Sequence, residues 1–429
     1  MSITVTEHRE EGLAFWMRAV LDERAKVLEN ATADAVHDLR VAVRRCRSMA
    51  EGMMAVDKPG PWRKMRRQAR EVFRELGVLR DTHVMLEWVQ QLGEPEDPVR
   101  LAIEALLGAR EAEAKAAALV ALKDFRVKRW KNWAGDLSAR VDRLEAGNPV
   151  FAHLALERWR EARALFIAAE RSGLPEGYHR LRVGIKRFRY TVENFLPESY
   201  AEWEKRLKEL QDLLGDVHDL DVLEVLLPQA GEVYDAEAQV RWTARIEHEK
   251  TRRMSAFRRR TTGAKSVWDA WRKGLPSRGE LAEAAMAKLE AWASFRDDDF
   301  PATRESARRA LEAFDAVKSG TTLLAQGPPS VRRVFQAACL LRRAGEDKDA
   351  EALPLLLGWT LRQKAMVACI VRTAARGPQA KPLAPFTQAE RETVVALSGL
   401  LRIGEAHTYR GTAEEKDVLP PSPPGRGLG

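Results

Sequence analysis

Two eleven-residue segments of this sequence combine a histidine with arginine and lysine at helical spacing. Residues 37–47 read HDLRVAVRRCR and residues 179–189 read HRLRVGIKRFR. At about 100° per residue, the basic side chains of each segment fall on one stripe of a helix, about 80° wide. The stripes contain His37, Arg40, Arg44 and Arg47 in the first segment, and His179, Arg182, Lys186 and Arg189 in the second. Like charges at these spacings repel, so each stripe requires an anionic partner.

The local charge balance favours an anion from outside the chain. Residues 40–74 contain 11 basic and 3 acidic side chains, an excess as large as the net charge of +8 of the whole chain. Further cations precede two glycines, Gly77 and Gly215; they are Arg63, Arg67, Arg70, Lys205 and Lys208. Arginine binds phosphoryl oxygens in pairs, and lysine acts as a point charge. Long rows of such side chains predict a linear polyanion as the ligand.

A second motif follows each basic segment, and both motifs recur in the same order. Residues 76–84 read LGVLRDTHV and residues 214–222 read LGDVHDLDV. The recurrence predicts a duplicated helical unit of roughly 140 residues. We expect Gly77 and Gly215 to allow close helix packing or a turn. We expect Asp81 and Asp219 to form ion pairs that orient basic side chains, without contacting the anion.

The elements that position these motifs are predicted to be helices almost throughout. Segments such as residues 101–125 are rich in Ala, Leu, Glu and Lys, with apolar residues three or four apart, and no convincing set of alternating strands occurs. Breaks that pair Gly with Pro separate the segments, for example at 58–61, 172–177 and 274–279. The fold class is therefore predicted to be all-α.

Composition excludes several classes of protein. The three cysteines form no CxxC pair, so neither a disulfide framework nor a cysteine zinc site is expected. No run of 18 uncharged apolar residues is present, and the N-terminus lacks the apolar core of a signal peptide. We expect a cytoplasmic protein with no membrane partner, no metal site and no cofactor.

The paired motifs resemble the CHAD domain, the conserved-histidine α-helical domain, over residues 8–275. The resemblance implies two four-helix bundles related by a pseudo-twofold axis, at residues 8–150 and 151–275. It implies that a basic groove between them binds inorganic polyphosphate through the eight stripe residues and the five cations near the glycines. The family is mainly a binding module, so no catalytic residue is expected. Polyphosphate granules and polyphosphate-metabolising enzymes are the expected partners.

A second resemblance covers residues 296–410, which are similar to the C-terminal helical, HD-like domain of Ppx/GppA exopolyphosphatases. It depends on residues 337–345, 387–397 and 400–407. That domain has a His-Asp pair where this chain has Arg342 and Arg343, which implies a degenerate domain without a hydrolase site. Residues 411–429 are rich in Pro and Gly towards their end and are expected to be a disordered tail.

Two alternative functions remain open at this stage. One is a polyphosphate or triphosphate hydrolase, or its accessory subunit, that uses the groove for substrate. The other is a nucleic-acid-binding protein. Tyr and Phe are nearly absent from the basic stripes, which disfavours stacking on bases and therefore nucleic acid as a partner.

Overall fold

The computed structural model describes residues 12–144, 147–230, 234–318, 330–344 and 356–416. These residues form helices and connecting turns, with no strand among them. The all-α prediction is confirmed. The chain divides into two compact units, the first ending at Ala284 and the second beginning at Ala285. None of the described helices is long and apolar enough to cross a membrane.

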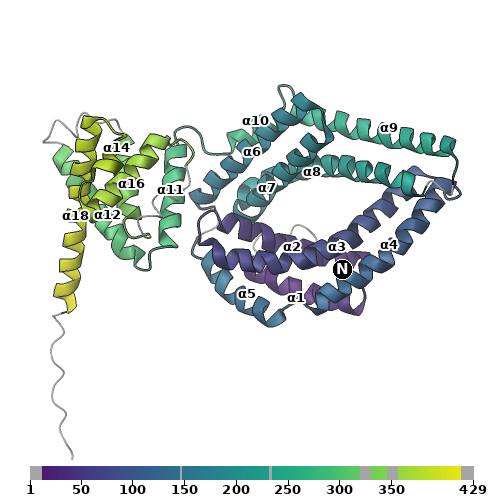
Figure 1. Ribbon diagram of the computed structural model, residues 1–429, viewed down its shortest axis with the longest axis horizontal. Helices are drawn as coiled ribbons and strands as arrows, with labels where there is room; N and C mark the ends of the chain where they lie inside the picture. Colours follow the sequence, from purple (N-terminus) through teal and green to yellow (C-terminus); the bar gives the residue numbers. More distant parts are fainter. Residues whose placement is uncertain (1–11, 145–146, 231–233, 319–329, 345–355, 417–429) are drawn as a thin grey trace, which may run out of the picture. The chain divides into compact units, whose positions relative to one another are not determined.

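The first half of the first unit contains four long helices and a shorter fifth one (Figure 1). They are α1 (Leu13–Glu29), α2 (Ala33–Met53), α3 (Pro59–Leu92), α4 (Pro98–Lys123) and α5 (Val127–Val141). The hydroxyl of Thr32 caps α2, and prolines in the first turn start α3 and α4, where a missing N–H costs nothing. The fifth helix is an addition to the expected four.

The second half repeats this order of helices. They are α6 (Pro149–Ser172), α7 (Pro175–Phe195), α8 (Pro197–Leu226), α9 (Ala236–Thr261) and α10 (Val267–Lys273), with a 3₁₀ turn, η2 (Leu227–Ala230), after α8. Corresponding helices contact each other across the two halves, α2 against α7, α3 against α8 and α4 against α9. Such like-with-like contacts are what a twofold-like axis produces. We call the α2–α7 and α3–α8 contact region the seam.

Tryptophans anchor the short fifth helix of each half. Trp130 of α5 is fully buried, and its indole N–H donates a hydrogen bond to the carbonyl oxygen of Met17 at 2.8 Å. In the second half, Trp268 and Trp271 of α10 are fully buried and meet edge to face, with ring centroids 5.5 Å apart. Each indole buries a large apolar area. The short helices therefore close the ends of the two bundles.

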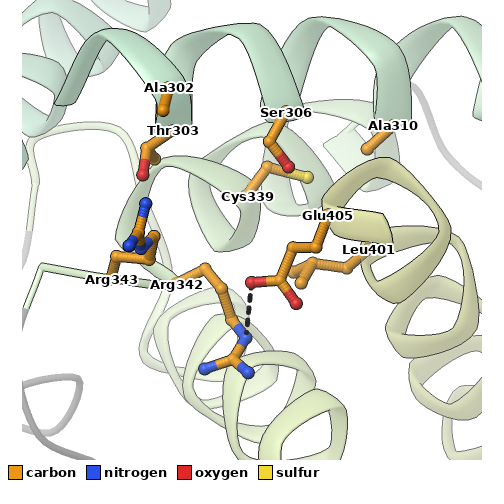
Figure 2. A pocket seen from close by; sticks show the side chains of 9 residues that line it. All are labelled: Ala302, Thr303, Ser306, Ala310, Cys339, Arg342, Arg343, Leu401 and Glu405. Atoms are coloured by element: carbon orange, nitrogen blue, oxygen red, sulfur yellow. Dashed lines mark ion pairs between the residues drawn. The ribbon is translucent and has the colours of Figure 1, made fainter. Parts of the chain in front are cut away.

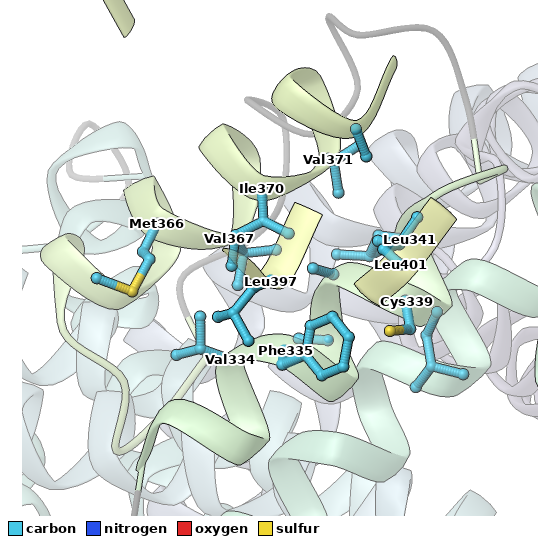
Figure 3. Packing of buried hydrophobic residues seen from close by; sticks show 14 of the residues in the cluster. Val334, Phe335, Cys339, Leu341, Met366, Val367, Ile370, Val371, Leu397 and Leu401 are labelled. Carbon is cyan, nitrogen blue, oxygen red and sulfur yellow. The ribbon is translucent and has the colours of Figure 1, made fainter. Parts of the chain in front are cut away.

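The second unit is a separate helical bundle. Its helices are α11 (Leu281–Ser294), which crosses the unit boundary, α12 (Phe300–Lys318), α14 (Ser330–Leu341), α16 (Leu361–Arg376), α17 (Ala380–Leu383) and α18 (Gln388–Lys416). Figure 3 shows Phe335 of α14 facing Val367 and Ile370 of α16 and Leu397 of α18 in its core. A Cβ on Gly404 of α18 would lie 2.8 Å from the carbonyl oxygen of Ser306, so α18 and α12 pack closely there.

The helix α18 extends past the boundary expected for the tail. It runs to Lys416, so residues 411–416 are helical. Their sequence, GTAEEK, contains good helix formers, which the prediction assigned to the tail. Residues 417–429, which hold the Pro/Gly-rich part of the predicted tail, lie outside the described residues.

Candidate anion-binding site

Four cations from the two repeated segments come together at the seam. Arg40 and Arg44 belong to α2, and Arg182 and Lys186 belong to α7. Burial, together with the charges of Arg182, Arg44 and Arg40, lowers the pKa of Lys186 to about 8. The two halves therefore contribute two cations each to one place. We call these four side chains, each partly exposed, the seam cluster.

Two carboxylates lie in the electric field of the seam cluster without forming the expected ion pairs. Burial raises the pKa of Asp219 to about 6, although the charge of Arg182 opposes the rise. The nearby charge of Asp81 contributes to this rise. In the described part of the chain, no carboxylate lies within 4.0 Å of a seam-cluster cation. Asp81 and Asp219 therefore do not form the expected ion pairs with the seam cluster. They interact with its cations over a longer distance.

The two repeated glycines each face the first arginine of a stripe, at different distances. Gly77 and Gly215 lie inside α3 and α8, so neither forms a turn. A Cβ on Gly77 would lie 3.1 Å from Nη1 of Arg40, and one on Gly215 would lie 4.0 Å from Nε of Arg182. Gly77 therefore provides the space in which the Arg40 guanidinium passes close to α3, whereas at Gly215 a Cβ would make only an ordinary contact.

Aromatic rings support the arginines of the first stripe. The guanidinium carbons of Arg40 and Arg47 each lie 4.5 Å from the ring centroid of Phe73, and that of Arg44 lies 5.3 Å from the ring of Tyr190. Nη1 of Arg40 also donates to the carbonyl oxygen of Phe73 at 3.3 Å. Cation–π contacts hold the guanidinium planes without neutralising their charge. Sequence reasoning missed Phe73 and Tyr190, although each is adjacent to a basic motif.

The structure separates Arg189 from the exposed cations. Arg189 is 9% exposed, and its Nη2 lies 3.5 Å from a carboxylate oxygen of Glu193. The hydroxyl of Tyr200 donates to the same oxygen at 2.9 Å. Burial and the neighbouring carboxylate of Glu193, which Arg45 also contacts, leave Arg189 less available to an anion than the prediction requires. Arg47, at the same position of the first copy, remains partly exposed.

A reciprocal pair of ion contacts crosses the seam. Nη2 of Arg45 lies 2.7 Å from Glu193 of the other half, and Nε of Arg187 lies 3.4 Å from Glu51. These residues occupy matching positions of the two copies, so the contacts repeat about the twofold-like axis. Sequence reasoning missed them because Arg45 and Arg187 fall outside the basic stripes. The sequence did contain a sign of these contacts. In both copies an arginine lies eight residues, and a glutamate fourteen residues, after the motif histidine.

A comparison with protein families agrees with this duplicated architecture. The family model described as CHAD domain matches residues 13–228, which is half of the chain. The chain belongs to the CHAD domain family. Among solved structures, the crystal structure of the CHAD domain from the plant Ricinus communis is similar at 22% sequence identity, with a TM-score of 0.41. That similarity covers 61% of this chain and 88% of that one. No curated protein matches.

The cations on the second helices of this CHAD domain are unequal in the two halves. All five predicted side chains, Arg63, Arg67, Arg70, Lys205 and Lys208, are exposed. Burial is the main cause of the lowered pKa of Arg47. The nearby charges of Arg66 and Arg70 on α3 lower it as well. On α8, acidic Glu204 takes the position that matches Arg66. The positive surface therefore continues from the seam along α3, and much less along α8.

The two motif histidines of the CHAD domain lie in different surroundings. His37 is exposed on α2, and its pKa is lowered by partial burial and by the charge of Arg80. His179 is exposed on α7, with its ring centroid 5.0 Å from that of His218. His179 and His218 line a cavity of about 260 Å³ between α7, α8 and α9. The two histidines therefore lie in similar sequence motifs but have different surroundings.

The second unit lies outside the family match, and it contains a small pocket (Figure 2). An ion pair of 3.2 Å joins Nε of Arg342 to Glu405, beside Cys339 and Thr303. The cavity volume of about 10 Å³ leaves room for about one water molecule. Within the described ranges, no group of three or more His, Cys, Asp or Glu side chains is placed to hold a metal ion. The exopolyphosphatase-like resemblance of this unit stays a prediction.

Proposed function

We propose that the CHAD domain of this chain binds inorganic polyphosphate across its seam. One observation supports this most directly: the seam cluster draws cations from both halves and, among the described residues, has no carboxylate in contact with it. Uncompensated guanidinium and ammonium groups attract phosphoryl oxygens strongly, because arginine donates in pairs and lysine adds a point charge. A polymer with one negative charge per link matches a row of such groups.

The shape of the positive surface supports a long ligand over a single phosphate group. Arg47, Arg66 and Arg70 continue the row of charges from the seam cluster onto α3. Since Arg66 also meets Glu51 at 3.6 Å, Arg70 is the stronger contact on this path. We propose that the polymer follows α3 away from the seam, and that α8 contributes less.

We propose a binding role without catalysis, in which the chain concentrates polyphosphate or attaches to polyphosphate granules. The supporting observation is that the groups nearest the proposed ligand path are guanidinium and ammonium groups, which bind phosphate without breaking it. An assay for phosphate released from polyphosphate in the presence of Mg²⁺ or Mn²⁺ tests the alternative hydrolase function. Sustained release by the pure chain would replace the binding proposal with the enzymatic one.

The binding proposal is tested by fluorescence anisotropy of end-labelled long-chain polyphosphate with the full chain. Electrostatic binding that releases counterions weakens steeply with salt, by about a hundredfold between about 50 and 200 mM for five phosphate contacts. RNA and DNA at equal phosphate concentration are expected to compete poorly. Absence of binding at low salt would contradict the proposal, and stronger binding of RNA or DNA would favour the nucleic-acid alternative.

The affinity for polyphosphate is expected to depend on pH through Lys186. Because its pKa in the free protein is about 8, Lys186 loses its proton as the pH rises from about 7 to 9, and binding weakens. Below about pH 6, protonation of Asp219 removes a negative charge and binding strengthens. The Lys186→Arg variant keeps its charge over this range. It should bind with a flatter profile above pH 7, and an unchanged profile would contradict the assignment.

A further inference from the structure

A large recess lies on the side of α3 that faces away from the seam. It is enclosed by α3, α4 and α5 and has a volume of about 800 Å³, within the usual range for small-molecule sites. Glu71, which lines it, is about 120° around α3 from Gly77, which faces Arg40 at the seam. The recess is therefore distinct from the seam cluster, although Arg67 in its lining is one of the five further cations predicted to contact polyphosphate.

The lining of the recess combines three kinds of group. Cations are supplied by Lys64 and Arg67 of α3 and by Arg126 and Arg129 around the start of α5. Trp133 of α5 supplies an indole that is partly exposed, with the guanidinium of Arg129 5.9 Å from its centroid. Such a lining suits a ligand that has both an aromatic ring and phosphate groups.

A carboxylate in the recess indicates which chemical groups the ligand should carry. Arg74 pairs with Glu75 at 2.6 Å, whereas Glu71 forms no ion pair with any described residue. A free carboxylate among cations repels a purely anionic chain, and it accepts hydrogen bonds from hydroxyl groups. A ligand with hydroxyl donors between a ring and phosphates would satisfy Glu71, the indole and the cations together.

The corresponding place in the second half is built differently, although the sequence repeats there. The pattern Trp-x-x-Trp occurs at 130–133 and again at 268–271. Trp271, the counterpart of Trp133, is fully buried with its ring centroid 5.4 Å from that of Phe188. Ala264 and Val267 occupy the positions that match Arg126 and Arg129. The first half alone therefore presents an accessible indole with cations beside it.

We propose that this recess binds a nucleoside phosphate. Its base stacks on Trp133, its ribose hydroxyls donate hydrogen bonds to Glu71, and its phosphates meet Lys64, Arg67 and Arg126. This inference does not rest on polyphosphate binding at the seam, because none of the residues named for the recess belongs to the seam cluster.

Isothermal titration calorimetry of the full chain with ATP and with 2′,3′-dideoxy-ATP tests the inference. We expect one ATP per chain at the recess, and weaker binding of the dideoxy compound. Trp133→Ala should weaken ATP binding by about tenfold, since a base stack is lost. Glu71→Ala, at an exposed position, removes the acceptor and should remove the preference for ATP over dideoxy-ATP, as a double-mutant cycle requires.

Three controls separate this site from the seam. Arg206→Glu, an exposed charge reversal on α8, should leave ATP binding unchanged. Tripolyphosphate, which has phosphates alone, should bind Trp133→Ala and the unsubstituted chain equally. Polyphosphate anisotropy should also be unchanged in Trp133→Ala. The inference is overturned if ATP does not bind, if Trp133→Ala binds ATP normally, or if Glu71→Ala keeps the preference for ATP.

Discussion

Exchanging Arg44 and Lys186 together for glutamate is expected to lower the affinity for polyphosphate by at least about a hundredfold, because two charge-assisted contacts worth about 1.5–3 kcal/mol each are lost. Both side chains lie in the seam cluster, one from each half, and the substituted carboxylates would repel the polymer as well. Anisotropy of labelled polyphosphate at fixed salt measures the loss. The salt dependence should also become shallower by about one unit of slope for each cation removed.

A matched control is available on α8. Arg206→Glu changes an exposed arginine away from the seam and should leave polyphosphate affinity nearly unchanged. Because the seam residues are partly buried, thermal unfolding of each variant establishes that it is folded before binding is compared. A folded double variant that binds polyphosphate as tightly as the unsubstituted chain would place the ligand elsewhere on the protein.

Removing the carboxylate of Glu193 is expected to destabilise the first unit by about 3–5 kcal/mol, the cost of leaving buried charges without their partner. The Glu193 side chain is 4% exposed and is shared by Arg45 of one half and Arg189 of the other. Glu193→Ala leaves both guanidinium groups facing each other in a poorly solvated place. Unfolding of the full chain in urea, followed by circular dichroism, measures the loss in free energy.

The duplicated sequence supplies the control for this prediction. Glu51 occupies the matching position of the first copy, but its side chain is 31% exposed and its ion contacts lie at 3.4–3.7 Å. Glu51→Ala should therefore cost no more than about 1 kcal/mol, as is usual for exposed ion pairs. Equal losses for Glu193→Ala and Glu51→Ala would show that burial does not distinguish the two positions.

Helix content and the membership of each basic stripe could be predicted from local spacing. The helical repeat places Arg40 and Arg44 on one face of α2, and Arg182 and Lys186 on one face of α7, whatever lies around them. The recurrence of the LG motif likewise pointed to a duplicated unit, which the helix order of the two halves reproduces. Spacing alone left Gly77 between close helix packing and a turn, and the passage of Arg40 beside α3 decides for close packing.

The sequence by itself determined an all-helical chain that carries two similar rows of cations, because helix geometry acts over a few residues. Tertiary structure alone decided which cations remain available to an anion. Arg189 and Arg47 occupy the same place in the repeat, yet Arg189 is buried beside Glu193, whereas Arg47 is partly exposed and lies over Phe73. The partner of a charge is set by helices that meet across the seam, as with Arg45 and Glu193, and burial of that contact decides whether solvent or ligand can reach it.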